Sequence, residues 1–507
     1  MKKTFYITTP IYYPSGELHI GHLYTTSLAW TIRNYKRARG YDAKMLTGSD
    51  EHGQKIEKKS IENNLSCQEY VDSMNQKFLD LWTAMDIDFD YFSRTTNQTH
   101  KDSVQNIFKE MLNNSDIYQG EYEGLYSVED EEYVTKTQAI KKNDDYYHYS
   151  SGHKLVPIKE KSYLLNVKKY EQWIKEYLIK NDVIYPEITA KELFNNFINK
   201  GLQDLSLSRT NFTWGVQIPG DEESVIYVWL DALTNYINTL GYPNGDDFKK
   251  YWKNGDEVVH IVGKEISRFH CIYWPIILNS LSLRQPTKII SHGWLVTSEG
   301  KMSKSKGNVI NPLDLLKNYD PEFIKYFFVS QIKIGSDGIF EEELFKNCYN
   351  ADLANNFGNL VSRTITMASN SFPNGISYVE KLESIDEEVY EFMQESYNQY
   401  TNLFDEYKID EALQQSILLS KHLNGYIDKT EPWLLKDDLE RLSIILTTLL
   451  NGIYYISYML RVVMPKNMNI VLEHLNLKSW NENLLNKNNK FEKIVLEKKN
   501  PIFLRKK

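Results

Sequence analysis

Two short segments of this chain carry residue types that suit the binding of a triphosphate. The first is His19-Ile20-Gly21-His22, which opens a helix-like segment directly after a strand-like run and a turn. A helix N-terminus offers unpaired N–H groups and partial positive charge, so it favours phosphate, and two imidazoles there can donate to phosphate oxygens as charge develops. Gly21 would let a nucleotide approach the backbone closely. Taken alone, the pattern also fits two structural histidines at a helix start.

The second segment is a lysine-rich loop, Lys301-Met302-Ser303-Lys304-Ser305-Lys306-Gly307-Asn308. Lysines on a loop with serine and glycine can surround a polyphosphate as point charges. The alternative is a solvated basic loop that binds nothing. A shared nucleotide site requires that the two segments, which are far apart in the chain, meet across one crevice and contact the same triphosphate.

The elements around the first segment predict how it is positioned. Residues 4–9 are β-prone, a turn-rich stretch follows, and a helix-like segment runs from about His19 to Arg39 before Gly40. A second strand-like run, Ala43 to Thr47, ends in Gly48-Ser49-Asp50. Strand, helix and strand at this spacing predict a βαβ unit and a parallel sheet. Ligands bind at the carboxyl ends of such strands, where His19 and Asp50 both fall.

The rest of the chain changes character twice. Residues 115–225 are rich in Tyr, Glu and Asp and have no βαβ rhythm, and strand-like runs then return at Val225–Leu230, Val258–Val262 and Lys288–Ser291. This pattern indicates one α/β domain interrupted by an insertion. From about residue 350 the pattern is helical, with helices expected over 351–370, 385–405, 409–428 and 438–463.

Composition places the chain among globular proteins, with 41% hydrophobic, 25% charged and 13% aromatic residues. The net charge of -9 argues only weakly against RNA binding, because a binder needs a basic face rather than a basic chain. Residues 481–507 are locally basic, which fits either a solubilising end or an RNA contact.

Cysteine content and the N-terminus both point to the cytoplasm. Cys67, Cys271 and Cys348 form no CxxC pair, which excludes a disulfide framework and argues against a cysteine-based zinc site. A sparse, odd cysteine count suits a reducing compartment. The first residues, MKKTFYITTP, lack an apolar stretch, so we expect no signal peptide.

Residues 442–460 contain no charged side chain, and this uncharged segment is nearly long enough to span a membrane. Ser443, Thr447 and Asn451, spaced four apart, would place a polar stripe on one helical face. We therefore expect a buried helix of a soluble bundle, with no membrane association.

The histidine and lysine segments together resemble, letter for letter and in the right order, the HIGH and KMSKS signatures of the class I aminoacyl-tRNA synthetases. Further segments resemble the methionine members of that class. They are Thr9 to Gly16, Thr47 to Gly53, Tyr227 to Leu233, and Gly263 to His270 running on to Trp274-Pro275. The similarity extends from Phe5 to about Phe503.

The resemblance implies a Rossmann-type catalytic domain in two halves, residues 1–114 and 226–320, separated by an insertion over 115–225 that handles the tRNA acceptor end. Residues 321–350 would form a stem-contact linker and residues 351–507 a helical anticodon-binding domain. The implied reaction joins methionine to ATP as methionyl-adenylate, with release of pyrophosphate. Methionine then passes to the terminal ribose of initiator or elongator methionine tRNA.

Residue roles follow from the same resemblance. The catalytic residues would be His19, His22, Lys301 and Lys304. These four would bind ATP together with Gly21, Gly263 and Ser303, and Mg²⁺ would bind with the nucleotide. The methionine pocket would comprise Ile11, Tyr13, Asp50, Trp229, Ala232, Leu233, Tyr236, Ile266, His270 and Trp274.

The chemistry of those residue types agrees with a methionine pocket. Aromatic walls suit a polarisable thioether, and Asp50 can pair with the substrate ammonium. His270 and Tyr13 could contact the sulfur. Without the resemblance, Trp229 and Trp274 could equally be core aromatics.

The insertion departs from much of the family, in which it often carries a zinc knuckle with CxxC pairs. The corresponding stretches here, Leu125 to Asp130 and Ser150 to His153, contain no cysteine. Asp130, His148 and His153 are too few and too hard to replace the thiolates. The chain resembles the zinc-free branch, and we expect no zinc.

The helical region resembles the part of the family that binds the CAU anticodon. Asn359, Arg363 and Trp433 match positions used there, and unstacked bases can stack on an aromatic ring and hydrogen-bond to such side chains. Trp433 could instead pack at a helix start. Many relatives append a dimerising domain, for which no room remains before Lys507, so we expect a monomer.

Three other functions remain open from the sequence. One is a class I synthetase for leucine, isoleucine, valine or cysteine, although the insertion is too short for an editing domain and metal-binding cysteines are absent. A second is a non-catalytic RNA-binding relative, which intact signatures disfavour. The third is a small-molecule adenylate-forming ligase, which the helical region disfavours.

Overall fold

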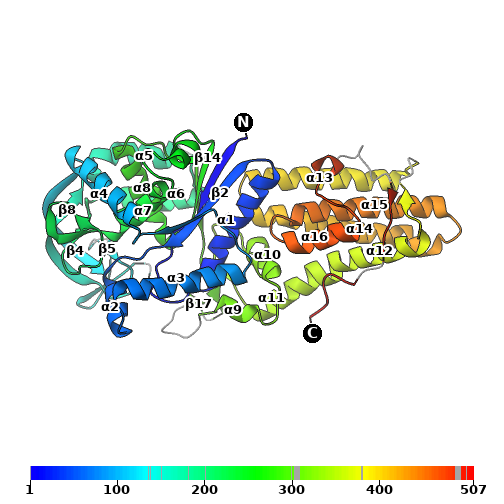
Figure 1. Cartoon of the computed structure of the whole chain (residues 1–507), viewed down its shortest axis with the longest axis horizontal. Helices are drawn as coiled ribbons and strands as arrows, with labels where there is room; N and C mark the ends of the chain where they lie inside the picture. Colours follow the sequence, from blue (N-terminus) through cyan, green and yellow to red (C-terminus); the bar gives the residue numbers. More distant parts are fainter. Residues whose placement is uncertain are drawn as a thin grey trace. The chain divides into compact units, whose positions relative to one another are not determined.

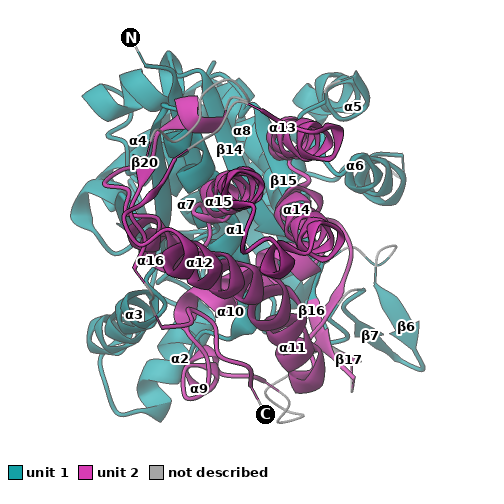
Figure 2. Cartoon of the chain, turned by 90° about the vertical axis from the view of Figure 1, so that its right-hand side faces the viewer, with its two compact units in different colours: residues 1–294 teal, residues 295–507 magenta. Residues whose placement is uncertain are grey.

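A computed structural model describes residues 2–134, 136, 139–149, 151–180, 182–199, 201–298, 300–301, 309–377, 381–485, 493–497 and 500–506. The chain divides into two compact units, Met1–Trp294 and Leu295–Lys507 (Figure 2). The first unit holds a large parallel sheet with helices and an antiparallel insertion (Figure 1). The second unit is predominantly helical.

The main sheet of the first unit has the order β3-β2-β1-β14-β15-β9, and all its neighbouring strands pair in parallel. Chain order reverses between β1 and β14, which is where ligands bind in sheets of this kind. The predicted fold class, an interrupted Rossmann-type sheet followed by a helical region, is confirmed. The strands are β1 (Thr4–Thr8), β2 (Asp42–Ser49), β3 (Tyr91–Arg94), β9 (Ile184–Tyr185), β14 (Glu257–Gly263) and β15 (Lys288–His292).

Helix α1 (Ile20–Ala38) is the crossover between β1 and β2, as the spacing predicted. Buried side chains fill most of its length, and its last turn carries Lys36 and Arg37. Lys36 Nζ lies 2.9 Å from Glu257 of β14, and the Lys36 side chain is nearly buried. The helix is thereby fixed against the sheet at the end opposite its histidines.

The strand predicted over Val225–Leu230 is wrong from Tyr227 onward. Strand β13 (Asp221–Ile226) ends before that residue, and Tyr227 is the N-terminal capping residue of helix α7 (Val228–Asn238). Nearly all of α7 is buried. A short, wholly apolar run cannot separate a buried strand from a buried helix, so periodicity gave no signal for this boundary.

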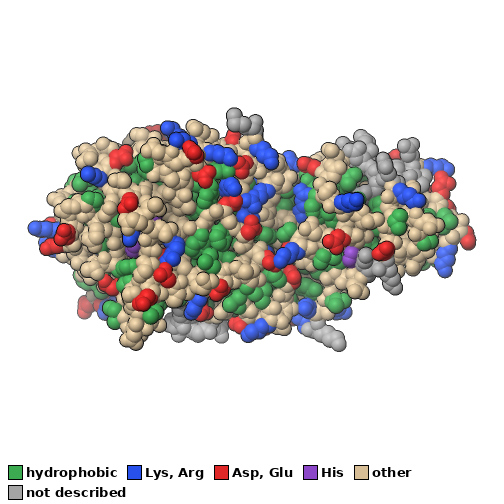
Figure 3. All heavy atoms as spheres, viewed as in Figure 1, with side chains coloured by type: hydrophobic (Ala, Val, Ile, Leu, Met, Phe, Trp, Pro, Cys, Tyr) green, Lys and Arg blue, Asp and Glu red, His purple; other side chains and the backbone are tan. Residues whose placement is uncertain are grey.

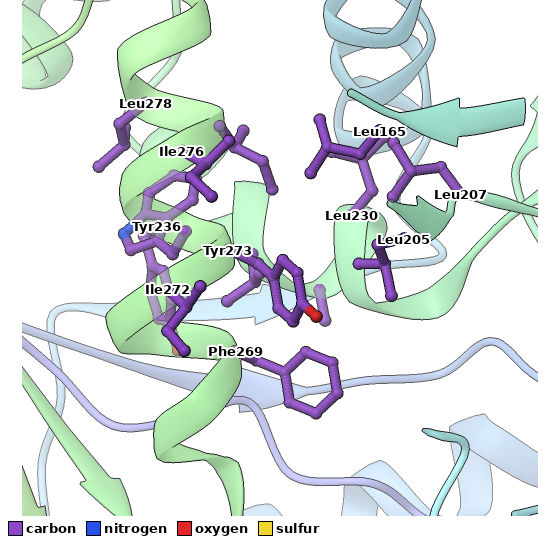
Figure 4. Close-up of a cluster of buried hydrophobic side chains, with 14 of the residues drawn as sticks. Leu165, Leu205, Leu207, Leu230, Tyr236, Phe269, Ile272, Tyr273, Ile276 and Leu278 are labelled. Atoms are coloured by element: carbon purple, nitrogen blue, oxygen red, sulfur yellow. The ribbon is translucent and has the colours of Figure 1, made fainter. Parts of the chain in front are cut away.

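The insertion is built around an antiparallel sheet of order β10-β8-β4-β5, formed by β4 (Ile117–Ser127), β5 (Glu132–Val134), β8 (Val156–Leu165) and β10 (Leu205–Ser206). Strand β9, which follows α5 (Glu171–Lys180), leaves it to become the edge strand of the parallel sheet. Leu165, Leu205 and Leu207 join the buried cluster that contains Leu230 of α7 and Tyr273 (Figure 4). The insertion and the parallel sheet therefore share one apolar core.

Within the insertion, Asp130 is the centre of a hydrogen-bonded cluster at the stretches that would hold zinc in a knuckle. Its Oδ2 accepts from Ser127 Oγ at 2.5 Å, Ser151 Oγ at 2.6 Å and His153 Nδ1 at 2.9 Å. Burial opposes ionisation of Asp130, but these hydrogen bonds outweigh it and hold the pKa of the carboxyl below its ordinary value. A carboxylate oxygen thus joins the two stretches here.

The helices predicted for the second unit are confirmed, with one difference. They are α12 (Asn359–Ser371), α13 (Ser384–Asp405), α14 (Ile409–Thr430) and α15 (Leu439–Leu460). The difference is that residues Tyr349–Gly358 form a wider, π-helical turn that leads into α12. Before it lie α10 (Pro321–Gln331) and α11 (Glu342–Cys348), and α16 (Pro465–His474) follows α15.

Helix α15 is long and apolar enough to cross a membrane, yet every residue from Leu442 to Leu460 is buried within the fold. Its polar stripe is satisfied internally. Ser443 Oγ donates to the Ser377 carbonyl at 2.9 Å, Asn451 Nδ2 donates to Tyr390 Oη at 3.1 Å, and Thr447 Oγ1 bonds the preceding turn. The expectation of a buried bundle helix is confirmed.

The cluster around Asp130 predicts a local, pH-dependent contribution to stability. Asp130→Asn should lower the free energy of unfolding of the insertion by roughly 1–3 kcal/mol, because the buried Ser127 hydroxyl, the Ser151 hydroxyl and the His153 imidazole lose a charged acceptor. The wild-type contribution should be complete above the unfolded pKa of about 3.9 and disappear as pH falls through the lower folded pKa. Hydrogen exchange of residues 125–155 at neutral and acid pH measures both effects.

Asp144→Asn is the matched control, because Asp144 is exposed in the same part of the insertion. Equal amide protection in the two variants at neutral pH would contradict the role assigned to Asp130.

Candidate active site

The carboxyl ends of β1, β2, β14 and β15 meet along one edge of the sheet. Past β1, Tyr12 pairs with Ser49: Tyr12 N–H donates to the Gly48 carbonyl at 2.9 Å, and Asp50 N–H donates to the Tyr12 carbonyl at 3.0 Å. A Cβ at Gly48 would lie 2.2 Å from the Ser93 carbonyl oxygen, so only glycine allows β2 and β3 to approach here. This ladder brings residues 11–13 and Asp50 together at the point where strand order reverses.

His19 and His22 form a reciprocal cap at the N-terminus of α1. His19 Nδ1 accepts from Gly21 N–H at 3.1 Å, and His22 Nδ1 accepts from His19 N–H at 3.0 Å. Each neutral ring therefore carries its proton on Nε2, where it can donate to an anion. The ring centroids are 4.0 Å apart and both residues are half-buried. Two donors and a positive helix end thus converge at the edge of the sheet.

Gly21 has a second role beyond close approach of a nucleotide. A Cβ there would lie 2.8 Å from Cε1 of the His19 ring. A side chain at this position would displace the capping imidazole. Gly263, the other predicted glycine, ends β14 beside β1, and its carbonyl accepts from Ser267 Oγ at 3.2 Å.

His292 contributes to this edge but was not identified from the sequence. It is the last residue of β15, and its Nε2 lies 2.8 Å from Thr25 Oγ1 on α1. Its Nδ1–H donates to the Gly293 carbonyl at 2.7 Å, so Nε2 accepts from the threonine. Burial lowers the pKa of His292. A histidine directly after the predicted strand Lys288–Ser291 was the available signal, and its function is to hold the helix of the histidine pair.

Asp50 is the chemically distinctive acid of the site. Among the described residues its Oδ1 is buried and has no hydrogen-bond partner. Burial raises the pKa of Asp50 well above its ordinary value, and the negative charges of Asp231, Glu131 and Glu51 raise it further. A carboxyl group in such surroundings is suited to a cationic ligand that would restore its charge and fill its empty acceptor position.

His270 and Tyr236 form a hydrogen-bonded pair in the apolar part of the site. Tyr236 Oη is 2.7 Å from His270 Nε2, and His270 Nδ1–H donates to the Ile266 carbonyl at 3.0 Å. Burial lowers the pKa of His270 to about 4, so the ring is neutral and Nε2 accepts from the tyrosine. Both ring nitrogens are therefore occupied. The expected contact between His270 and a thioether sulfur would have to involve the rest of the ring.

Most of the other predicted pocket residues, though not Tyr13, lie in or against one apolar cluster that contains Tyr236. Trp229 stacks on Phe269 with centroids 3.8 Å apart and planes 3° from parallel, and its Nε1 is buried without a hydrogen-bond partner in the part of the chain described. Trp274 is fully buried 5.8 Å from Tyr236 and donates to His260. The cluster also contains Ile11, Ala232 and Leu233, with Trp229 and Ile266 packed against it.

A buried carboxylate between two imidazoles holds α7 in place, and the sequence alone did not reveal it. Asp231 Oδ2 lies 2.7 Å from His52 Nδ1, and Asp231 Oδ1 lies 2.8 Å from His100 Nε2. Burial alone would raise the pKa of Asp231, but the two imidazoles outweigh it and hold the pKa at about 2. The helix that carries Trp229 and Tyr236 is thereby tied to the segments that follow β2 and β3.

In the second unit, Arg363 is the link between the other two residues predicted to bind the anticodon, Asn359 and Trp433. Asn359 and Arg363 are four residues apart on α12, hence on one face. The Arg363 guanidinium lies 5.9 Å from the centroid of the Trp433 ring and 3.6 Å from Asp428. Trp433 is 44% exposed, so packing within the unit covers only part of this side chain.

The lysine loop lies mostly outside the described residues. Ser303 and Lys304 belong to the part of the chain that is not described, and Lys301 is placed only by its backbone, in β17 (Gly300–Lys301). Strand β17 pairs with β16 (Leu295–Thr297). No group of three or more His, Cys, Asp or Glu side chains that could hold a metal ion occurs among the described residues.

Comparisons with known proteins agree with this geometry. The family described as tRNA synthetases class I (M) matches residues 5–365. A methionine–tRNA ligase of Mycoplasmopsis pulmonis is 48% identical over 507 residues, covering 100% of this chain and 99% of that protein. A methionine–tRNA ligase of Listeria monocytogenes serotype 4b is 42% identical over 94% of this chain and 74% of its own length.

Solved structures match as well. The methionyl-tRNA synthetase of Mycobacterium tuberculosis in complex with methionyl-adenylate superimposes with a TM-score of 0.94 at 29% identity, covering 99% of this chain and 100% of that one. The apo form of the M. tuberculosis enzyme gives a TM-score of 0.87 at 27% identity. The family match over most of the chain, together with a relative of nearly equal length, shows that this chain belongs to the class I tRNA synthetases of the methionine group, the methionine–tRNA ligases.

Proposed function

We propose that this protein activates L-methionine with ATP and transfers it to the terminal ribose of methionine tRNA, both initiator and elongator. The observation that carries the proposal is the convergence, at one edge of a parallel sheet, of a phosphate-binding helix end and a carboxyl group suited to an ammonium. The M. tuberculosis relative binds methionyl-adenylate, which is the compound that such a site would form.

In the first half-reaction, a carboxylate oxygen of methionine attacks the α-phosphorus of ATP. The bond from that phosphorus to its bridging oxygen breaks, and pyrophosphate leaves. His19 and His22 donate their Nε2–H groups to phosphate oxygens as charge develops, and Gly21 and Gly263 give the nucleotide room beside the backbone. Lys301, Ser303 and Lys304 bind the β- and γ-phosphates. Positioning and electrostatic stabilisation supply the catalysis, so no covalent nucleophile is required.

Methionine would lie between Asp50 and the apolar cluster. Its ammonium pairs with Asp50, and its side chain packs against Ile11, Tyr13, Trp229 and Tyr236, where aromatic rings suit a thioether. Ala232, Leu233, Ile266, His270 and Trp274 complete or support these walls. His270 acts by fixing the Tyr236 hydroxyl, since its own nitrogens are engaged.

Any Mg²⁺ in this reaction would be bound by the phosphates of ATP, where it neutralises the leaving pyrophosphate. The described residues include no cluster of acidic or imidazole side chains able to hold a metal ion by itself. Asp130, which bonds Ser127, Ser151 and His153, supports an insertion that needs no zinc.

In the second half-reaction, the terminal ribose hydroxyl of tRNA attacks the carbonyl of the adenylate, and AMP leaves. Residues 1–114 and 226–320 serve as the catalytic domain, 115–225 guide the acceptor end, 321–350 contact the stem, and 351–507 bind the CAU anticodon. Basic and acidic side chains intermingle on the face shown in Figure 3, so RNA contacts would depend on local basic groups such as Arg363. We further propose a cytoplasmic monomer.

The decisive experiment is charging of methionine tRNA by the purified protein, with anticodon variants as controls. Methionine-dependent ATP–pyrophosphate exchange should occur, and each of the other amino acids should support far less. Exchange driven by leucine, isoleucine, valine or cysteine would reassign the substrate. A lack of any adenylate would favour the non-catalytic alternative, and adenylate formation without tRNA charging would favour a small-molecule ligase.

Asp50→Asn should raise the KM for methionine by roughly 10–100-fold in the exchange reaction, because the substrate ammonium loses a charge-assisted hydrogen bond. The KM for ATP should change little. Asp102→Asn, an exposed neutralisation on α4 (Gln98–Asn113), is the control. An unchanged methionine KM in Asp50→Asn would remove Asp50 from the site.

Lys304→Ala should lower kcat/KM for exchange at least tenfold, equivalent to about 1.4 kcal/mol of transition-state stabilisation. The lysine supplies positive charge where the pyrophosphate gains negative charge. Lys317→Ala, an exposed lysine after the loop, should retain normal exchange. A loss below tenfold in Lys304→Ala would count against the assigned role.

Trp433→Ala should impair aminoacylation of tRNA while pyrophosphate exchange stays near normal, because a base would lose its stacking surface. We expect roughly 1–3 kcal/mol of lost tRNA affinity, measured as a tRNA KM. Leu434→Ala removes an adjacent side chain that is 67% exposed and serves as the control. Equal losses in both half-reactions would contradict anticodon binding by Trp433.

A further inference from the structure

Glu131, near the start of the insertion, is a buried carboxylate whose contacts reach three of the segments that carry the proposed methionine site. The residue is only 6% exposed, and its backbone φ is 51°, in the left-handed region that residues other than glycine rarely adopt. Such a conformation persists where the surrounding contacts fix it. Nothing in the motifs of the sequence singled this residue out.

The first contact of Glu131 fixes the turn that carries Asp50. Its Oε1 accepts from Lys55 N–H at 3.2 Å, in the first turn of α2 (Gln54–Glu62). The capping position of α2 is Gly53, which has no side chain to do this. Glu131 therefore caps the helix from the insertion, and an anion is favoured at that helix end. Asp50 lies directly before the capped turn.

The second contact reaches Tyr13. Tyr13 Oη–H donates to Glu131 Oε1 over a long 3.4 Å, and Tyr126 Oη–H donates to Oε2. A Cβ at Gly53 would lie 2.6 Å from Tyr13 Oη and 3.2 Å from Glu131 Oε1, so a glycine at this position keeps the space open. The carboxylate thus links the turn after β1 with the turn after β2.

The third contact reaches α7 through the backbone of Glu131. Tyr227 Oη–H donates to the Glu131 carbonyl at 2.6 Å, and Tyr227 is the capping residue of α7. Helix α7 carries Trp229 and Tyr236 of the proposed pocket. One residue of the insertion therefore touches three separate segments of the catalytic half.

The negative charge of Glu131 also acts on Asp50. Three carboxylates raise the pKa of Asp50: Asp231, Glu131 and Glu51. Asp231 is paired with His52 and His100, and Glu51 forms an ion pair with Arg94 at 2.7 Å. The carboxylate of Glu131, by contrast, accepts hydrogen bonds from a backbone N–H and two tyrosine hydroxyls. Burial raises the pKa of the Glu131 carboxyl, and these hydrogen bonds oppose that rise together with the positive charge of Arg209, which lies 3.9 Å from the centroid of the Tyr126 ring.

From these contacts we infer that Glu131 is a positioning residue for methionine binding. It couples the insertion to Tyr13, to the Asp50 turn and to α7, and its charge adds to the negative potential that selects the substrate ammonium. The inference rests on the proposed methionine site and goes beyond it, because it assigns ammonium selectivity to a residue of the tRNA-handling insertion.

The test compares three ligands in Glu131→Gln, a variant that keeps the size and acceptor atom of the side chain but removes its charge. L-methionine has both ammonium and carboxylate, L-methioninol keeps only the ammonium, and the desamino analogue of methionine keeps only the carboxylate. We expect the KM for methionine and the inhibition constant of methioninol to rise at least fivefold. The inhibition constant of the desamino analogue and the KM for ATP should change less than twofold.

A pH profile adds a readout that a purely structural role would not move. The charged groups that act on Asp50 are Glu131 from the insertion, Asp231 from α7, and Glu51 from its own turn. The hydroxyls of Tyr13, after β1, and Tyr236, on α7, face it as well, and the Asp50 charge raises the pKa of both. Methionine should bind better as pH rises through the pKa of Asp50, because the ammonium needs the ionised carboxylate. Removal of the Glu131 charge lowers that pKa, so the midpoint of the KM profile should move to lower pH in Glu131→Gln.

Glu129→Gln is the matched control, since it removes a half-exposed negative charge two positions earlier, beside Lys55. It should leave all four constants and the pH midpoint unchanged. If Glu131→Gln weakens the desamino analogue as much as methionine, or if its pH midpoint does not move, the inference is overturned. Absence of methionine-dependent exchange in the wild-type protein would overturn the proposed function instead, so the two failures are distinct.

Discussion

The reversal of strand order between β1 and β14 is the constraint on which the site depends. Connections leave these two parallel strands in opposite directions along the sheet, so the carboxyl ends of both remain open to a ligand. Helix α1 starts at that point, with its positive end and its two capping imidazoles. Lys36, in the last turn of α1, pairs with Glu257 of β14, and Thr25, near the start of α1, contacts His292 of β15. The topology therefore leaves the N-terminus of α1 at this edge of the sheet, where two imidazoles add donors to it.

Buried carboxylates connect the elements around this edge, and each is satisfied by imidazole or guanidinium donors. Asp231 uses two imidazoles, Glu51 uses Arg94, and Glu132 of the insertion uses Arg268 at 2.6 Å. Because an unpaired buried charge is costly, these partners restrict how the insertion and the two sheet halves can be arranged. Asp50 differs, since one of its buried oxygens has no partner among the described residues. This difference separates the acid that we propose for ligand binding from the acids whose partners lie within the fold.

The insertion is part of the catalytic unit rather than an appendage. It contributes strand β9 to the parallel sheet, and its leucines pack in the same core as α7. Its residue Glu131 accepts a hydrogen bond from Lys55, in the turn that follows Asp50. Within it, a single carboxylate oxygen of Asp130 accepts hydrogen bonds from Ser127 and Ser151 and so joins two of its turns. The proposed tRNA-handling element is thereby joined through packing and hydrogen bonds to the proposed methionine site.

The sequence by itself determined the fold class, the βαβ unit, the helices of the second unit and the identity of the histidine pair. These depend on local periodicity, on capping residues and on short motifs, which neighbouring residues encode. Tertiary structure alone decided that Val228 begins a helix, that His270 has both nitrogens engaged, and that Asp231, His292 and Glu131 support the site. The physical reason is that a carboxylate gains its role from partners that lie far from it in the chain, and such pairings leave no periodic trace in one sequence.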